Sequence, residues 1–131
     1  IEFASWIHSL DSYRLGEQLQ VDAQALNRTV RVLIEVNISG EAEKTGLAPE
    51  DLWSLLERSR AWNHLSIDGL MGMAGLHSSD PQRDFAALRQ LRDDCRVHLG
   101  DMQALPHLSM GMSGDFEAAI RQGATMVRIG S

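Results

Sequence analysis

Two short stretches near the end of the sequence carry residue types that can hold a phosphate. Leu108 to Asp115 reads LSMGMSGD, and Gly123 to Ser131 reads GATMVRIGS. Each combines an apolar strand with a turn of small residues, and the first turn also opens a predicted helix. Neighbouring strand ends of this type gather backbone N–H groups and hydroxyls around one point, as α/β folds do when they bind an anion. The chemistry indicated is recognition of a phosphate-bearing ligand.

The candidate phosphate contacts within these stretches are Ser113, Gly130 and Ser131. The Ser113 hydroxyl can donate to a phosphate, although serine before an acidic first turn also serves as a plain helix N-cap. Gly130 allows the backbone to approach an anion closely, or it is needed only for a turn. Asp115 and Glu117 place negative charge near the same helix start, so an anion site there requires that their side chains point outward.

The elements that position these residues alternate between strand and helix. The predicted strands are 6–10, 30–38, 67–74, 108–112 and 125–129; the predicted helices are 15–26, 49–62, one that begins at 80–81, and 115–122. Helical spacing predicts inward-facing side chains, namely Leu15, Leu19 and Leu26, then Leu52, Leu55 and Leu56, then Phe85, Leu88, Leu91, Cys95 and Leu99. Apolar strands separated by amphipathic helices predict a parallel sheet with right-handed crossovers.

Composition narrows the class of protein. A chain of 131 residues with 44% hydrophobic content is long enough for one core and too short for two. The net charge of −6, without a basic run, argues against a nucleic-acid partner. The sequence shows no apolar run of the ~20 residues that a membrane span needs, and no metal-ligand spacing among its histidines. The single Cys95 fits a core thiol in a reducing cytoplasm.

The two ends of the sequence suggest a piece of a larger barrel. The chain begins at Ile1 without methionine, and no helix follows its last strand. Five strands do not close a (β/α)8 barrel, which takes about 250 residues. We therefore expect residues 1–131 to form a single domain that is an incomplete parallel β/α barrel with about five strands.

Six motifs follow one another in a recognisable order: Ile7–Ser12, Val36–Ile38, Glu43–Gly46, Asp68–Met71, Leu108–Asp115 and Ala118–Ser131. In this order they resemble the pyridoxal phosphate homeostasis proteins over nearly the whole chain. The resemblance implies a barrel like the N-terminal domain of alanine racemases, which binds pyridoxal 5′-phosphate (PLP) through a Schiff base to a lysine on the first strand. It implies that this chain holds strands four to eight and that this lysine lies upstream, because Lys44, the only lysine here, belongs to a different motif.

The resemblance also implies roles for individual residues. In the racemase barrel, the residues that match Gly130 and Ser131 hold the phosphate, and the position of Arg128 faces the pyridine nitrogen. A guanidinium there keeps that nitrogen unprotonated and weakens the ring as an electron sink, which suits a carrier better than an amino-acid enzyme. The alternative for Arg128 is an internal ion pair with Glu35 or Asp68.

Three further residues carry two interpretations each. Lys44 approaches the phenolate oxygen of the cofactor, or it is a solvated loop residue beside Glu41 and Glu43. Met73 packs on the face of the ring, where a thioether fills irregular gaps, or it belongs to the core. Asn37 forms a hydrogen bond inside the barrel mouth, or it merely ends its strand.

The resemblance implies that the intact protein holds and buffers PLP without substrate turnover and passes it to PLP-dependent apo-enzymes. We expect that protein to be a monomer, and this piece to self-associate through an exposed edge strand. One alternative is a PLP-dependent racemase or decarboxylase on the same barrel. Racemisation would need a second acid/base and a further domain, and Met73 stands where the racemase barrel has a histidine. Another alternative is a structural piece that binds nothing alone and pairs with a partner chain.

Overall fold

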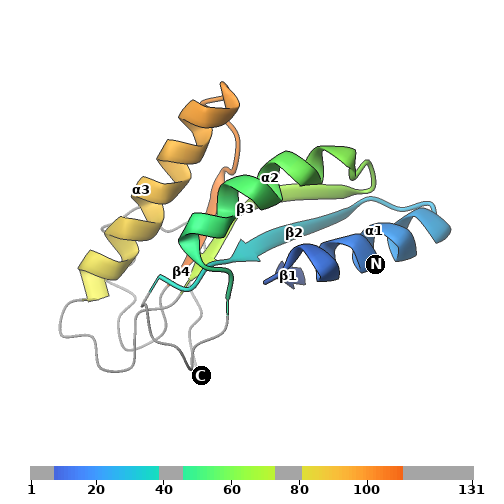
Figure 1. Ribbon diagram of the computed structural model, residues 1–131, viewed down its shortest axis with the longest axis horizontal. Coiled ribbons are helices and arrows are strands. Elements are labelled where there is room, and N and C mark those ends of the chain that lie inside the picture. Colours follow the sequence, from blue (N-terminus) through green and yellow to red (C-terminus); the bar gives the residue numbers. More distant parts are fainter. Residues whose placement is uncertain (1–7, 39–45, 73–80, 111–131) are drawn as a thin grey trace.

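A computed structural model describes residues 8–38, 46–72 and 81–110 (Figure 1). Strands β1 (His8–Leu10), β2 (Val30–Glu35), β3 (Leu65–Gly72) and β4 (His107–Met110) alternate with helices α1 (Tyr13–Ala25), α2 (Leu52–Arg58) and α3 (Pro81–Leu99). Short 3-10 helices, η2 (Pro49–Asp51) and η3 (Ser59–Ala61), flank α2. The predicted helix 115–122 and strand 125–129 lie outside the described residues.

The strands form one parallel sheet in the order β1-β2-β3-β4. This confirms the predicted α/β class, and the described residues supply four of the five expected strands. The predicted helix 49–62 is divided into η2, α2 and η3. None of the helices in the described part of the chain has both the length and the apolar character needed to cross a bilayer.

Local signals explain where the helices begin and end. The backbone N–H of Leu15 donates to the Ser12 hydroxyl over 3.2 Å, which caps α1. Asn27 follows α1 with φ of 53°, and Gly100 follows α3 with φ of 69°. Both residues occupy the left-handed position of a Schellman motif, which returns the chain toward the next strand. Pro49 opens η2 at a position where no N–H is needed.

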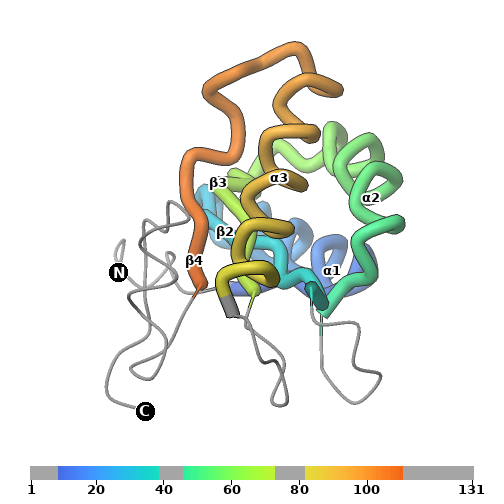
Figure 2. Tube along the Cα trace, turned by 90° about the vertical axis from the view of Figure 1, so that its left-hand side faces the viewer, coloured from blue at the N-terminus to red at the C-terminus, as the bar shows by residue number. Residues whose placement is uncertain are grey.

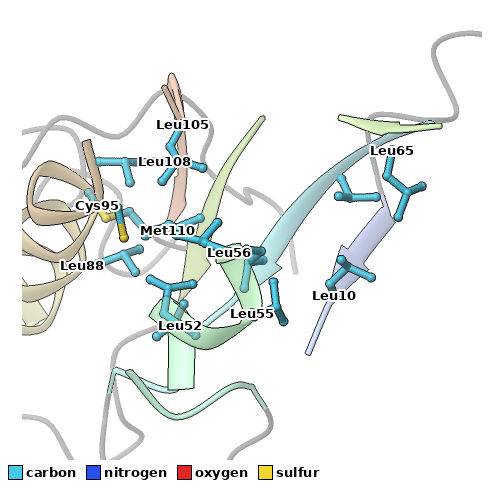
Figure 3. Close-up of a cluster of buried hydrophobic side chains, with 14 of the residues drawn as sticks. Leu10, Leu52, Leu55, Leu56, Leu65, Leu88, Cys95, Leu105, Leu108 and Met110 are labelled. Atoms are coloured by element: carbon cyan, nitrogen blue, oxygen red, sulfur yellow. The ribbon is translucent and has the colours of Figure 1, made fainter. Parts of the chain in front are cut away.

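One face of the sheet packs against the helices. Leu10, Ile34, Leu70 and Leu108 stand in register across the four strands, and each is 0% exposed. Figure 2 shows α1 and α2 on one side of the strands, and the shared core places α3 there as well. The helix residues of this core, several of them seen in Figure 3, are Ala23, Leu52, Leu55, Leu56, Phe85, Leu88 and Cys95. Each large aliphatic side chain buried in it contributes about 1.5–3 kcal/mol.

The predicted stripe of α1 is wrong for two of its three residues, because only Leu19 packs against the core. Leu15 is 38% exposed and Leu26 is 70% exposed, whereas the buried residues of the helix are Gly16, Gln20 and Ala23. The indole of Trp62 lies so close to Gly16 that a Cβ added there would meet the ring at 2.1 Å. A small residue therefore faces inward because a large aromatic ring from another part of the chain fills the space.

Candidate functional site

The carboxyl ends of the strands meet at one edge of the sheet, seen for β3 and β4 in Figure 2. We call the sheet face opposite the helices the inner face. Its residues alternate with the core residues, and they are Ser9, Arg31, Leu33, Glu35, Ser66, Gly69, Met71, His107 and Ser109. Leu33 and Met71 are both 5% exposed, yet neither belongs to the helix-side core. In β/α barrels this edge carries the ligand site.

Glu35, Met71 and Ser109 form the row of the inner face nearest the carboxyl edge. Ser109 is 7% exposed and places a hydroxyl in this row. A carboxylate, a thioether and a hydroxyl thus lie side by side on three neighbouring strands. Met71 and Ser109 were not among the predicted site residues, and Glu35 was named only as a possible partner of Arg128. The alternation of side chains along each strand is the signal that identifies all three.

The opposite end of the inner face carries an ion pair. The Arg31 Nε donates to Asp68 Oδ2, and the Ser66 hydroxyl donates to Asp68 Oδ1 over 2.6 Å. Asp68 is 7% exposed, so its charge is held by these donors rather than by water. The described structure thus gives Asp68 a structural partner near the amino ends of β2 and β3, away from the candidate site.

A β-bulge sets this arrangement. The register between β2 and β3 shifts between Val32 and Leu33, and Asp68 is the extra residue on β3. Gly69 comes next, and a Cβ added to it would lie 2.0 Å from the backbone oxygen of His107. Glycine is therefore required where β3 and β4 approach each other, which gives a physical reason for the Asp68–Met71 motif.

Asn37 is the one predicted site residue within the described part of the chain. Its backbone N–H donates to the carbonyl of Leu47 over 2.9 Å, and the N–H of Leu47 donates to the carbonyl of Glu35 over 2.8 Å. Gly46, with φ of 115°, packs so close that a Cβ would lie 2.8 Å from the Asn37 nitrogen. The Asn37 backbone thus pairs with the returning chain at the carboxyl edge, and both alternatives given for its side chain stay predictions.

The other predicted site residues lie outside the described part of the chain. They are Lys44, Met73, Ser113, Arg128, Gly130 and Ser131. Both alternatives given for Lys44 and for Met73 stay predictions, as do the phosphate contacts and the role of Arg128.

No group of three or more His, Cys, Asp or Glu side chains in residues 8–38, 46–72 and 81–110 is placed to hold a metal ion. Cys95 is 0% exposed. Burial, with a smaller contribution from Asp94, raises the pKa of its thiol to about 11. The group is therefore a protonated core thiol at neutral pH, as its helical spacing predicted, and not an activated nucleophile.

Known proteins share this arrangement of strands and helices. The family profile described as "Alanine racemase, N-terminal domain" matches residues 3–131. A pyridoxal phosphate homeostasis protein of Aquifex aeolicus is 44% identical over 127 residues, which are 95% of this chain and 55% of that protein. Its counterpart in Pseudomonas aeruginosa is 41% identical and covers 99% of this chain and 55% of the relative. The chain thus spans about half the length of these relatives.

Solved structures agree with the sequence matches. PipY of Synechococcus elongatus, solved with PLP bound, superposes with a TM-score of 0.84 at 32% identity, covering 96% of this chain and 58% of PipY. An alanine racemase of Clostridium difficile superposes with a TM-score of 0.72 at 15% identity, covering 93% of this chain and 32% of the racemase. The racemase likeness is one of fold alone, whereas the match to the family profile runs over nearly every residue. The chain belongs to the alanine racemase N-terminal domain family.

Proposed function

We propose that this chain is part of a protein that binds PLP and holds it for vitamin B6 homeostasis without substrate turnover. The observation that carries the proposal is the likeness to PLP-bound PipY, at a TM-score of 0.84 and 32% identity. Relatives named pyridoxal phosphate homeostasis proteins support the same function. PLP-dependent apo-enzymes are the partners that such a carrier would supply, and the lone buried Cys95 suits a cytoplasmic protein.

The proposed domain is a single unit over residues 1–131 that supplies strands four to eight of a (β/α)8 barrel. Its support is the parallel sheet of β1 to β4 and the coverage of 55% of the Aquifex aeolicus relative. In such a barrel the inner face of this sheet would line the interior. The polar residues found there suit a barrel that opens to a ligand at its carboxyl edge.

The residues of the carboxyl edge suit a phosphorylated pyridine ring. Met71 and Ser109 offer a thioether and a hydroxyl from neighbouring strands, and Asn37, two residues beyond β2, would add an amide. An aromatic ring with polar substituents needs apolar surface together with a few directed polar groups, and this set provides both. When bound, PLP supplies an aldehyde that amines attack reversibly and a ring that withdraws electrons.

We propose that Ser113, Gly130 and Ser131 bind the phosphate through hydroxyls and backbone N–H groups. Ser113 follows Met110, the last residue of β4, by three positions. Arg128 would face the ring nitrogen and hold it unprotonated, since a guanidinium does not give up its proton. This role suits a carrier because it weakens the electron sink on which amino-acid chemistry depends.

Lys44 and Met73 are proposed as contacts to the ring. The support for Lys44 is that it precedes Gly46 by two residues in the sequence, and Gly46 packs against the Asn37 backbone at the carboxyl edge. Met73 follows Gly72 directly, and strand alternation would place it on the face that carries Met71. Covalent attachment is assigned to a lysine upstream of Ile1.

A titration of the chain with PLP, read by absorbance and equilibrium dialysis, tests the proposed function. Pyridoxal, which lacks the phosphate, is the matched ligand control, and inorganic phosphate is the competitor. We expect PLP to bind at least tenfold more tightly than pyridoxal and Ser131→Ala to weaken PLP about tenfold, because a hydrogen bond to a charged group contributes about 1.5–3 kcal/mol. Equal affinity for PLP and pyridoxal, or no binding of either, contradicts the proposal.

A further inference from the structure

Gly72 ends β3 at the carboxyl edge, and two side chains fill the space beside it. A Cβ added to Gly72 would lie 3.2 Å from Ile38 Cδ1 and 3.3 Å from Leu88 Cδ2. Ile38 comes from the chain just beyond β2, whereas Leu88 comes from α3. The missing side chain of Gly72 therefore lets Ile38 pack directly on the end of the neighbouring strand.

The other side of Ile38 borders open space. A groove of about 270 Å³ runs between α3 and η2, and its lining residues are Ile38, Pro49, Ala87, Gln90, Leu91 and Asp94. Ile38 is thus supported by Gly72 and Leu88 on one side and faces a largely apolar groove on the other. If the contact with Gly72 is tightened, the side chain has room to move outward.

A movement of Ile38 would be passed to the candidate site through the backbone. Ile38 follows Asn37, whose N–H is fixed to the carbonyl of Leu47 over 2.9 Å. Gly72 follows Met71 and stands in register with Met110. The contact between Ile38 and Gly72 is consequently a direct side-chain link between the ends of β2 and β3, immediately beside Asn37 and Met71.

We propose that Ile38 is a positioning residue of the ligand site. Packed on Gly72, it sets the spacing between the carboxyl ends of β2 and β3, and with it the relative placement of Asn37 and Met71. Ile38 itself faces the core and the groove, so it acts through these neighbours and not by contact with the ligand. The inference rests on the proposed PLP function for its effect on affinity.

The test combines one substitution that adds a methyl group beside Ile38 with another that removes a methyl group from Ile38. Gly72→Ala adds a methyl 3.2 Å from Ile38 Cδ1, and Ile38→Val removes that Cδ1 atom. We expect Gly72→Ala to lower PLP affinity about fivefold to tenfold, with a small loss in Tm because Ile38 can yield into the groove. The double variant Gly72→Ala/Ile38→Val should return to within about twofold of the parent affinity. Ile34→Val is the matched control, since it removes the same methyl from a β2 residue that is 0% exposed and pairs with Leu70 rather than packing on Gly72.

A second readout needs no ligand. In NMR spectra of the unliganded chain, the Met71 methyl and the Asn37 side-chain amide should shift in Gly72→Ala and return in the double variant. This arm distinguishes the two proposals, because a chain that fails to bind PLP contradicts the proposed function while the NMR signals still decide the role of Ile38. Two results would overturn the inference. One is that the Met71 and Asn37 signals do not change in Gly72→Ala, and the other is that Ile34→Val restores the properties of Gly72→Ala as fully as Ile38→Val does. If Gly72→Ala does not fold, Ile38→Val must shift the Asn37 amide while Ile34→Val does not.

Discussion

At the scale of single residues, Gly69 and Gly100 differ in the space that each leaves for an added methyl group. A Cβ on Gly69 would lie 2.0 Å from the backbone oxygen of His107, whereas nothing lies within 4 Å of a Cβ on Gly100. Gly69→Ala must separate β3 from β4, and we expect a loss of about 3 kcal/mol or more in the free energy of unfolding. Gly100→Ala has only the left-handed backbone to accommodate and should lose about 1 kcal/mol.

Urea unfolding followed by circular dichroism compares the two variants. Both carry the same chemical change, so the difference between them isolates the contact across the strands. A Gly69→Ala chain as stable as Gly100→Ala would mean that β3 and β4 are not paired in the register described.

Asp68 gives a second prediction at this scale. Its carboxylate accepts from Arg31 and from the Ser66 hydroxyl, and its side chain is 10% exposed. Asp68→Asn removes the charge from a buried hydrogen-bonded site, and we expect it to lower the free energy of unfolding by about 1–3 kcal/mol. The matched control is Asp93→Asn, because Asp93 pairs with Arg92 over 2.9 Å but its side chain is 45% exposed. That exposed pair should contribute at most about 1 kcal/mol, so equal losses in the two variants would contradict the buried role of Asp68.

At the scale of elements, α1 is joined to the segment after α2 through one carboxylate. Glu17 accepts from Trp62 Nε1 over 2.6 Å and from the Tyr13 hydroxyl over 2.8 Å. The Tyr13 and Trp62 rings stack with centroids 5.3 Å apart, and the Arg58 guanidinium lies over the Tyr13 ring. The hydrogen bond from Trp62, then that from Tyr13, lowers the pKa of Glu17 below 4.5, and the bond to Glu17 raises the pKa of Tyr13 above 10.0.

The hydrogen bonds of Glu17 with Trp62 and Tyr13 predict that the stability of the fold depends on pH. A carboxyl with a lower pKa in the folded chain stabilises the fold above its unfolded pKa of about 4.5. That contribution is lost as the pH falls through the folded value. Tm measured from pH 3 to 6 should therefore rise less steeply in Glu17→Gln than in the parent chain. Parallel Tm curves for the two chains would mean that Glu17 is not bound in the folded state.

The element types could be predicted from the sequence because hydrophobic periodicity is a local property. The inward residues of α2 and the central part of α3 were predicted for this reason, and Phe85 and Leu88 are both 0% exposed. The inward face of α1 could not be predicted, because it depends on Trp62, which lies far along the chain from Gly16. The bulge at Asp68 also depends on pairing between strands, which no local pattern reports.

At the scale of the whole molecule, the site was predicted from motifs at the ends of strands. Parallel strands bring their carboxyl ends to one edge of the sheet, whatever the intervening sequence. By that general rule Asn37, which follows β2, lies at this edge, while the role of its side chain stays a prediction. It could not assign the inner face, because that assignment requires the register between strands as well as the parity of each strand. Met71 and Ser109 were missed on this account, although they stand side by side once the register is known.

The last prediction concerns the inner face of the sheet. Parallel sheets are covered on both faces, yet α1, α2 and α3 all pack on one face, and the other carries Arg31, Glu35 and His107. If this chain supplies strands four to eight of a barrel, the strands that close it belong to the portion of the Aquifex aeolicus relative that this chain does not match.

Mixed with that portion, produced as a separate polypeptide, the chain should form a 1:1 complex in sedimentation velocity, whereas alone it should self-associate as its concentration rises. The relative itself, divided at the same boundary, is the positive control, and Ile34→Asp, which disrupts the helix-side core, is the negative one. Independent sedimentation of the two polypeptides, under conditions where the divided relative reassembles, would rule out the proposed barrel.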